Sequence, residues 1–306
     1  MRKQSLLYVA GAVLVSVLGY AYMRPSKPSK TISDLQQQTK PTAVATADKV
    51  ADDDKDNPAF AKNQQLVDSY TKEIAAGNLK DGDTYYQRGL VYLKMRYLRA
   101  AIADFSAALK LVPDSANAFY SRALAYQQEQ RFDEAILDLN EAIKYKADFA
   151  AAYNLRGLIY VEQNNFRDAQ ADYETAIKVN PDFDLAYFNL GTLYARQKNY
   201  QAAKEAFLTA IKINQQPAED ATEDDRAAAK SRLAITYLNL ANVEFAMDDL
   251  PNALKTIDYL IENDPTNVEA YKLRADIYDR QGNTAGATND RATADNLQLQ
   301  NMLNSR

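Results

Sequence analysis

Charged residues that could bind an anion or form internal ion pairs recur at fixed positions in this sequence. Arginines occupy one position of a repeating pattern and aspartates occupy a second position further along: Arg88, Arg122, Arg156 and Arg274, with Asp104, Asp138, Asp172 and Asp290. In two further copies of the pattern both are replaced together, by Leu190 with Ala206 and by Leu240 with Thr256. A ligand-binding arginine has no reason to disappear together with an aspartate. We therefore predict arginine–carboxylate pairs, with an arginine ladder for an anionic ligand as the alternative.

Catalytic and metal-binding chemistry has little support in the composition. The chain has no cysteine and no histidine, which excludes disulfides, cysteine-based zinc sites, cysteine nucleophiles and Ser-His-Asp triads. The run Asp52-Asp53-Asp54 is typical of a solvated charge cluster and not of a metal site. We expect no enzymatic activity and no cofactor.

The net charge is unevenly distributed along the chain. The formal charge is −5, yet residues 1–30 carry five basic residues and no acidic one, so the remainder is acidic: Arg2, Lys3, Arg24, Lys27 and Lys30. A nucleic-acid-binding protein presents a basic face to its ligand. The acidic body therefore argues against a nucleic-acid partner.

A pattern of aromatic and small residues repeats every 34 residues. Its first copy contains Tyr85, Gly89, Tyr92, Ala101, Phe105, Ala108 and Pro113. The same offsets are occupied in copies that begin at Phe119, Tyr153 and Tyr187, and the pattern resumes at Tyr237 and Tyr271 after an insertion. Each copy is typical of two amphipathic helices, and one such pair cannot bury its apolar face alone.

This pattern resembles the tetratricopeptide repeat signature. The resemblance implies an all-α protein, an α-solenoid of antiparallel helix pairs, with units at about 82–115, 116–149, 150–183, 184–217, 234–267 and 268–303. Residues 58–81 would form a capping helix before the first unit. The last unit would end in a polar helix, at about Leu303, that suits a terminal repeat.

Smaller features of the repeats predict details of the packing. Small residues such as Gly89 are expected to face the small residue at Ala101, so that the two backbones approach closely. Pro113, like Pro181 and Pro265, is expected to end a second helix. Ala147 stands at that position in the second unit, so its second helix should run on slightly. The fifth unit should have a longer first helix.

The N-terminal residues predict a membrane segment followed by a linker. Residues 5–23 are uncharged and apolar, and nineteen residues make a helix of about 28 Å, close to the hydrocarbon thickness. We favour a retained anchor within residues 1–24, but a cleaved signal peptide is the alternative because Gly19 and Ala21 suit a signal peptidase. Residues 25–57 are typical of a disordered spacer. We expect an extracytoplasmic body, on the periplasmic side of a bacterial inner membrane, with a cytosol-facing body as the alternative.

The resemblance also implies a concave groove lined by the first helix of each unit. The candidate groove residues are Tyr86, Gln87, Leu90, Tyr120, Leu124, Asn154, Leu158, Phe188, Asn189, Asn239 and Asn242. Amide side chains can donate to and accept from a peptide backbone, while apolar neighbours take its side chains. The charged clamp by which family members grip an acidic C-terminus is missing, because its positions hold Tyr86, Leu90, Ser121, Ala151 and Leu155. We expect an uncharged or amphipathic segment of a partner protein.

Two functions agree with this layout of anchor, spacer and repeats. The first is a membrane-anchored scaffold or adaptor, similar to bacterial envelope proteins of the family. The second is a chaperone-like periplasmic holdase that binds many exported chains in the same groove. One or a few partners would indicate the scaffold, and many unfolded clients would indicate the holdase.

Overall fold

The described part of the chain is built of α-helices. The computed structural model describes residues 58–77, 82–215 and 223–304, and every regular element in these ranges is an α-helix. The predicted all-α solenoid is confirmed over these ranges. The predicted membrane segment at residues 5–23 and the spacer at residues 25–57 lie outside the described residues. The helices are α3 (Pro58–Ala75), α4 (Asp83–Lys94), α5 (Leu98–Leu111), α6 (Ala116–Gln128), α7 (Phe132–Tyr145), α8 (Ala150–Glu162), α9 (Phe166–Val179), α10 (Asp184–Arg196), α11 (Tyr200–Asn214), α12 (Glu223–Ala246), α13 (Leu250–Asn263), α14 (Val268–Gln281) and α15 (Thr284–Asn304).

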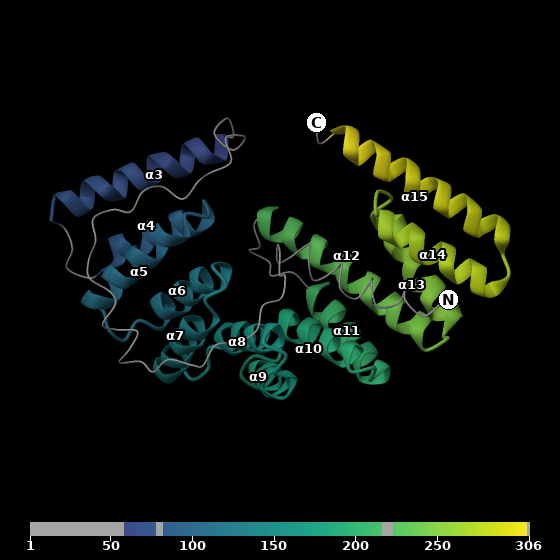
Figure 1. Ribbon diagram of the computed structural model, residues 1–306, viewed down its shortest axis with the longest axis horizontal. Helices are drawn as coiled ribbons and strands as arrows, with labels where there is room; N and C mark the ends of the chain where they lie inside the picture. The colour runs from purple at the N-terminus through teal and green to yellow at the C-terminus, as the bar shows by residue number, and fades with distance from the viewer. Residues whose placement is uncertain (1–57, 78–81, 216–222, 305–306) are drawn as a thin grey trace. The chain divides into compact units, whose positions relative to one another are not determined.

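Consecutive helices pack side by side in pairs, and the pairs fall into two compact units (Figure 1). Residues 58–180 contain α3 and the pairs α4–α5, α6–α7 and α8–α9. Residues 181–304 contain the pairs α10–α11, α12–α13 and α14–α15. Each pair is one copy of the sequence pattern, so the helices form where the repeats predict them.

The first helices of successive pairs contact one another directly. In residues 58–180, α6 contacts both α4 and α8, and in residues 181–304, α12 contacts both α10 and α14. Among the described helices, no two second helices of one unit make a comparable contact. Successive pairs therefore lie closer together on the side of the first helices. We call the surface formed by these first helices within each unit the inner face.

Glycine in the first helix makes room for an aromatic ring in the second. A methyl group built on Gly89 would lie 2.7 Å from Cε1 of Phe105, and one built on Gly191 would lie 2.9 Å from Cδ1 of Phe207. Phe105 is fully buried. The ring of Phe105 thus lies against Gly89, and in the third pair a methyl group built on Gly157 would lie 3.2 Å from the carbonyl oxygen of Ala169, the small residue expected to face it.

The second helices of the first three pairs end at equivalent residues, Leu111, Tyr145 and Val179, whether or not proline follows. The residue before each proline is extended, as at Val112, where φ is −129° and ψ is 83°. The expectation that the second unit's last helix runs on is wrong, because α7 ends at Tyr145 and Lys146 has φ −139° and ψ 89°. The turn geometry is thus set by the packing of the next pair as well as by proline.

The turn within each pair contains one left-handed residue. Gly282 has φ 78° between α14 and α15, but the other described turns place non-glycine residues there: Arg96, Gln130, Asn164, Lys198 and Asp248, with φ between 58° and 62°. A left-handed conformation costs a non-glycine residue about 1–2 kcal/mol. Arg96, Gln130 and Lys198 therefore carry a recurrent local strain, which Gly282 avoids and which asparagine and aspartate, at Asn164 and Asp248, tolerate better.

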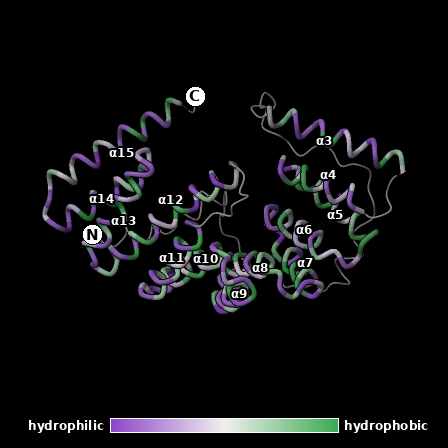
Figure 2. The backbone as a smooth tube through the Cα atoms, turned by 180° about the vertical axis from the view of Figure 1, so that it is seen from behind, coloured by the Kyte–Doolittle hydropathy of each residue, from purple (hydrophilic) through white to green (hydrophobic). Residues whose placement is uncertain are grey.

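Some described helices differ in length from the rest. They are the helices at the two ends of the described chain and the first helix of the fifth pair. Helix α12 has 24 residues, compared with 12–14 in the other first helices, which confirms the prediction of a longer helix. Helix α15 has 21 residues and is polar. None of the described helices combines the length and the apolar character that a membrane span requires. Figure 2 accordingly shows hydrophobic and hydrophilic residues mixed along each of them.

Candidate partner-binding surface

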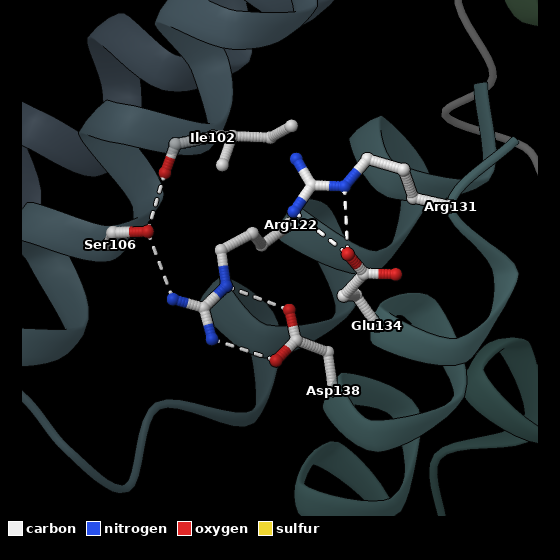
Figure 3. A network of polar contacts seen from close by, with 6 residues as sticks. All are labelled: Ile102, Ser106, Arg122, Arg131, Glu134 and Asp138. Carbon is white, nitrogen blue, oxygen red and sulfur yellow. Dashed lines mark hydrogen bonds and ion pairs between the residues drawn. The ribbon is translucent and has the colours of Figure 1, made fainter. Parts of the chain in front are cut away.

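The arginine ladder forms internal ion pairs, as predicted. The guanidinium of Arg122 donates two hydrogen bonds of 2.7 Å, from Nε and Nη2, to the two carboxylate oxygens of Asp138 (Figure 3). The same two bonds join Arg88 to Asp104, Arg156 to Asp172 and Arg274 to Asp290. Bidentate pairing of this kind is the strongest arginine–carboxylate geometry. These guanidinium groups are therefore used within the fold.

Each of these arginines also reaches a third helix. Nη1 of Arg122 donates to Ser106 Oγ at 2.9 Å, and Ser106 in turn donates to the Ile102 carbonyl (Figure 3). The other three donate to Thr71, Asn140 and Asp258, each on the helix that precedes the arginine's own helix. The hydrogen bond to Asp172 raises the pKa of Arg156 and outweighs the opposing effect of burial. We call each such arginine, with its partners on two other helices, a three-helix bridge.

A different set of residues makes the bridge at α12. Glu244 is 3% exposed, accepts from Thr256 Oγ1 at 2.7 Å and lies 3.0 Å from Nζ of Lys204. These residues lie on α12, α13 and α11, so they join the same three positions of the fold. Burial lowers the pKa of Lys204, but its bonds to Glu244 and Asp249 outweigh this and raise it overall.

Sequence reasoning did not find these additional partners. The sequence only weakly indicates the third partners of the arginines: the polar residues Ser106, Asn140 and Asp258 share one offset of the second helix. The sequence indicates a special role for Glu244 more clearly, since it stands where the other repeats have tyrosine. A carboxylate at a core position needs a cation nearby, and the lysine of the preceding second helix supplies it.

Two aromatic candidates in residues 58–180 lie half-buried on the inner face. The hydroxyl of Tyr86 lies 3.4 Å from Oγ of Ser121, and its ring centroid is 5.8 Å from that of Phe105. The ring centroid of Tyr120 is 4.9 Å from that of Phe149, and burial raises the pKa of its hydroxyl. Both rings thus join adjacent helices and keep one part of their surface exposed.

The remaining candidates of residues 58–180 differ in accessibility. Leu90 and Leu124 pack partly into the core. Leu158 is half-buried. The side-chain amide of Gln87 donates to Asp83 Oδ1 at 3.2 Å and is partly exposed. Asn154 is only 6% exposed, so the structure places its amide inside the repeat and not on the surface.

The candidates of residues 181–304 combine one ring with three amides. Phe188 packs its ring 5.9 Å from that of Phe207. The Nδ2 of Asn242 donates to the Leu238 carbonyl at 2.8 Å, which leaves its side-chain oxygen as an acceptor. The Nδ2 of Asn239 is buried without a hydrogen-bond partner. Asn189 is half-buried on α10.

The candidate positions together carry apolar groups and amides but no charge. Helix α14 differs, because Asp276 and Asp279 on it both accept from Arg291 of α15, at 3.2 and 2.7 Å. Within each unit, the inner face of α4 to α12 can therefore offer apolar contact and neutral hydrogen bonds to a polypeptide.

The sequence profile of the tetratricopeptide repeat family matches residues 86–152, 154–220 and 238–294, which is well over half of the chain. The protein belongs to the tetratricopeptide repeat family. Domains of this family bind protein or peptide partners. No curated protein matches the sequence significantly.

Several solved tetratricopeptide repeat structures are similar to this chain. PilF of Pseudomonas aeruginosa is 20% identical with a TM-score of 0.58, over 70% of this chain and 90% of PilF. PilW, a type IV pilus biogenesis factor, is 20% identical with a TM-score of 0.56, over 69% of this chain and 90% of PilW. The Cut9–Hcn1 structure is 15% identical with a TM-score of 0.60, over 78% of this chain and 44% of that one. At these identities the likeness shows the tetratricopeptide repeat fold.

Proposed function

We propose that this protein is a membrane-anchored scaffold that holds a partner polypeptide on the inner face of its repeats. The ligand is an uncharged or amphipathic segment of the partner. The repeats lie on the extracytoplasmic side of the membrane, and the protein has no catalytic activity.

The observation that supports partner binding most strongly is the chemistry of the inner face. The four arginines of the ladder are committed to internal bridges, as Arg122 is to Asp138 and Ser106. The candidate positions that are half-buried, such as Tyr120, Leu158 and Asn189, are neutral. A neutral surface of rings, aliphatic chains and amides suits an uncharged segment, because an acidic one would lose its hydration without gaining a cation.

The proposal of an anchor rests on the apolar run at residues 5–23. This run carries no charge and is flanked by Arg2, Lys3 and Arg24. It is long enough to cross the hydrocarbon of a bilayer. The spacer that follows, residues 25–57, would give the repeats a reach of about 30 Å from the surface as a flexible coil.

Affinity capture by the full-length chain tests the partner-binding surface. Leu158→Lys places a charge on the inner face of α8, and we expect it to reduce recovery of the partner at least tenfold. Ala171→Lys places the same charge on an exposed position of α9, outside the inner face, and should leave recovery unchanged. Equal recovery by Leu158→Lys and wild type, with both folded by circular dichroism, would contradict the proposed surface.

Cell fractionation tests the anchor, and protease protection tests the side of the membrane. Leu14→Arg puts a charge in the middle of the apolar run, and we expect it to move the protein from the membrane to the soluble fraction. Intact cells should protect the repeats from added protease, while spheroplasts should not. Degradation that requires lysis of the inner membrane would place the repeats in the cytosol instead.

The number of captured proteins separates the scaffold from the holdase. A scaffold recovers one or a few proteins in fixed proportion to the bait. A holdase recovers many unfolded exported chains, and blocking export would change the set. The second result would replace the scaffold while leaving the inner face as the binding surface.

A further inference from the structure

A row of leucines crosses the first helices of residues 58–180. Leu90, Leu124 and Leu158 lie 34 residues apart, at one offset of α4, α6 and α8, and each is half-buried. Because α6 contacts both α4 and α8, the three positions follow one another across the inner face. Leu90 and Leu124 pack on the core with part of their surface, and the rest reaches water. We call these three side chains the leucine row.

The same offset is polar in residues 181–304, where it holds Thr192, Asn242 and Asp276. The hydroxyl of Thr192 donates to the Phe188 carbonyl at 2.9 Å, and Asp276 accepts from Arg291 at 3.2 Å. An apolar side chain placed against such groups would take them out of water without replacing their hydrogen bonds. Among the described first helices, leucine at this offset is therefore a feature of α4, α6 and α8.

Polar groups border the leucine row on the preceding helical turn. Tyr86 and Gln87 lie four and three residues before Leu90, and both are half-buried. Tyr120 lies four residues before Leu124 and is half-buried too. Phenol hydroxyls and side-chain amides can each donate and accept a hydrogen bond. An apolar row beside such groups suits a ligand that has one apolar and one polar face.

The spacing of the row distinguishes a helical ligand from an extended one. The axes of packed helices lie about 8–10 Å apart. An α-helix covers about 10 Å in about seven residues, and residues seven apart return to the same face. A β-strand covers that distance in about three residues, and residues three apart point to opposite faces. Of the two, the helix can present an apolar side chain to all three leucines.

We propose that the leucine row binds the apolar face of an amphipathic α-helix of the partner, whose apolar residues recur about every seven positions. This inference rests on the proposed function and deepens it, because it names the class of segment that the inner face holds. Two such spacings require a helix of at least about 15 residues. It lies across α4, α6 and α8 and keeps its polar face in water.

Photo-crosslinking of the full-length chain in cells tests the helical ligand. An apolar photoreactive amino acid replaces Leu90, Leu124 or Leu158 in turn, and mass spectrometry identifies the residue of the partner that each captures. We expect the captured residues to advance by about six to eight positions from one repeat to the next.

Two results would contradict the helical ligand in different ways. An advance of about three positions per repeat would indicate an extended segment. That spacing, or captured residues without any regular advance, would overturn this inference and leave the proposed function standing. Absence of a captured partner at all three positions would contradict both.

Matched asparagine variants test the apolar contact itself. With the photoreactive residue at Leu158, Leu124→Asn should reduce capture at least tenfold, because it places an amide in the middle of the row. Thr192→Asn puts the same residue at the same offset of α10, where a polar side chain already stands, and should change capture less than twofold.

Undiminished capture by Leu124→Asn, with circular dichroism showing a folded protein, would overturn the inference. Leu124→Ala takes the place of this variant if the asparagine prevents folding. The alanine shortens the side chain without adding a polar group, and capture should then fall at least threefold. Unchanged capture by the folded alanine variant would overturn the inference as well.

Discussion

Gly157 and Tyr173 are complementary in shape: a methyl group built on the glycine would lie 2.7 Å from Cε1 of the tyrosine ring. The same relation joins Gly89 to Phe105 and Gly191 to Phe207. In the second and fifth pairs the first helix carries alanine instead and the second carries an aliphatic residue, as Ala123 does with buried Leu139 and Ala241 with buried Ile257. In the first five pairs the size of one residue thus follows the size of the other.

Substitutions at Gly157 and Tyr173 test whether the sizes of the two side chains depend on each other. We expect Gly157→Ala to lower the free energy of unfolding by about 1–3 kcal/mol, because the added methyl overpacks a fully formed contact. Adding Tyr173→Leu recreates the alanine–leucine combination of the second repeat and should recover part of that loss. Denaturant-induced unfolding followed by circular dichroism measures both.

The single variant Tyr173→Leu serves as the control for this cycle. Alone it leaves space beside Gly157 and should destabilise the fold, since lost ring contacts are not replaced. If the double variant lowers the free energy of unfolding by the sum of the two single effects, the two residues act independently and the shape argument fails.

The ion pair of Arg156 and Asp172 should show strong coupling. Its side chains are only 18% and 8% exposed, so either single change, Arg156→Leu or Asp172→Ala, leaves a poorly solvated charge and should cost about 3–5 kcal/mol. The double change should cost clearly less than the sum, because it recreates the apolar combination of Leu190 and Ala206. Thermal and denaturant unfolding of the four proteins give the coupling energy, and a coupling near zero would refute the pair.

Relief of the left-handed turns should stabilise the protein. Lys198 has φ 62°, and replacing it with glycine removes a strain of about 1–2 kcal/mol at the expense of a more flexible unfolded chain. We expect Lys198→Gly to raise the free energy of unfolding by about 0.5–1 kcal/mol, as measured by denaturant-induced unfolding. Asn164→Gly is the matched control and should gain less, since asparagine tolerates this conformation. Equal or negative effects at both sites would show that the turns are unstrained.

Alkaline pH should weaken residues 181–304 through Tyr237. Burial, together with the neighbouring Tyr259, raises the pKa of Tyr237 to about 12. Folding therefore favours the protonated phenol, and its contribution to stability is complete below the unfolded pKa of about 10 and is lost as pH rises from 10 to 12. The difference in tyrosinate absorbance between wild type and Tyr237→Phe should titrate near pH 12. A difference curve centred at pH 10 would contradict the raised pKa of Tyr237.

The helix pairs and their ion pairs could be predicted from sequence because they depend on short, repeated spacings. Positions such as Arg122 and Asp138 always fall on facing sides of two adjacent helices, so their joint replacement in other repeats was informative. The longer α12 was predictable in the same way, from helix-forming residues placed before a repeat.

Details that depend on packing between neighbouring pairs could not be predicted. The burial of Asn154 and the bridge from Lys204 to Glu244 require the position of a helix outside the residue's own pair. The end of α7 at Tyr145, without a following proline, is set by where the next pair packs. The left-handed turns gave no signal, because residues as different as Arg96 and Asp248 occupy the same position.

The most direct test of the central claim is site-specific photo-crosslinking in cells. A photoreactive amino acid replaces Leu158 on the inner face of α8 or, as the control, Ala171 on the outer helix α9 of the same pair. We expect Leu158 to capture one or a few proteins, through uncharged or amphipathic segments, and Ala171 to capture none of them. Capture of the same proteins from both positions, or from Ala171 alone, would contradict binding at the inner face.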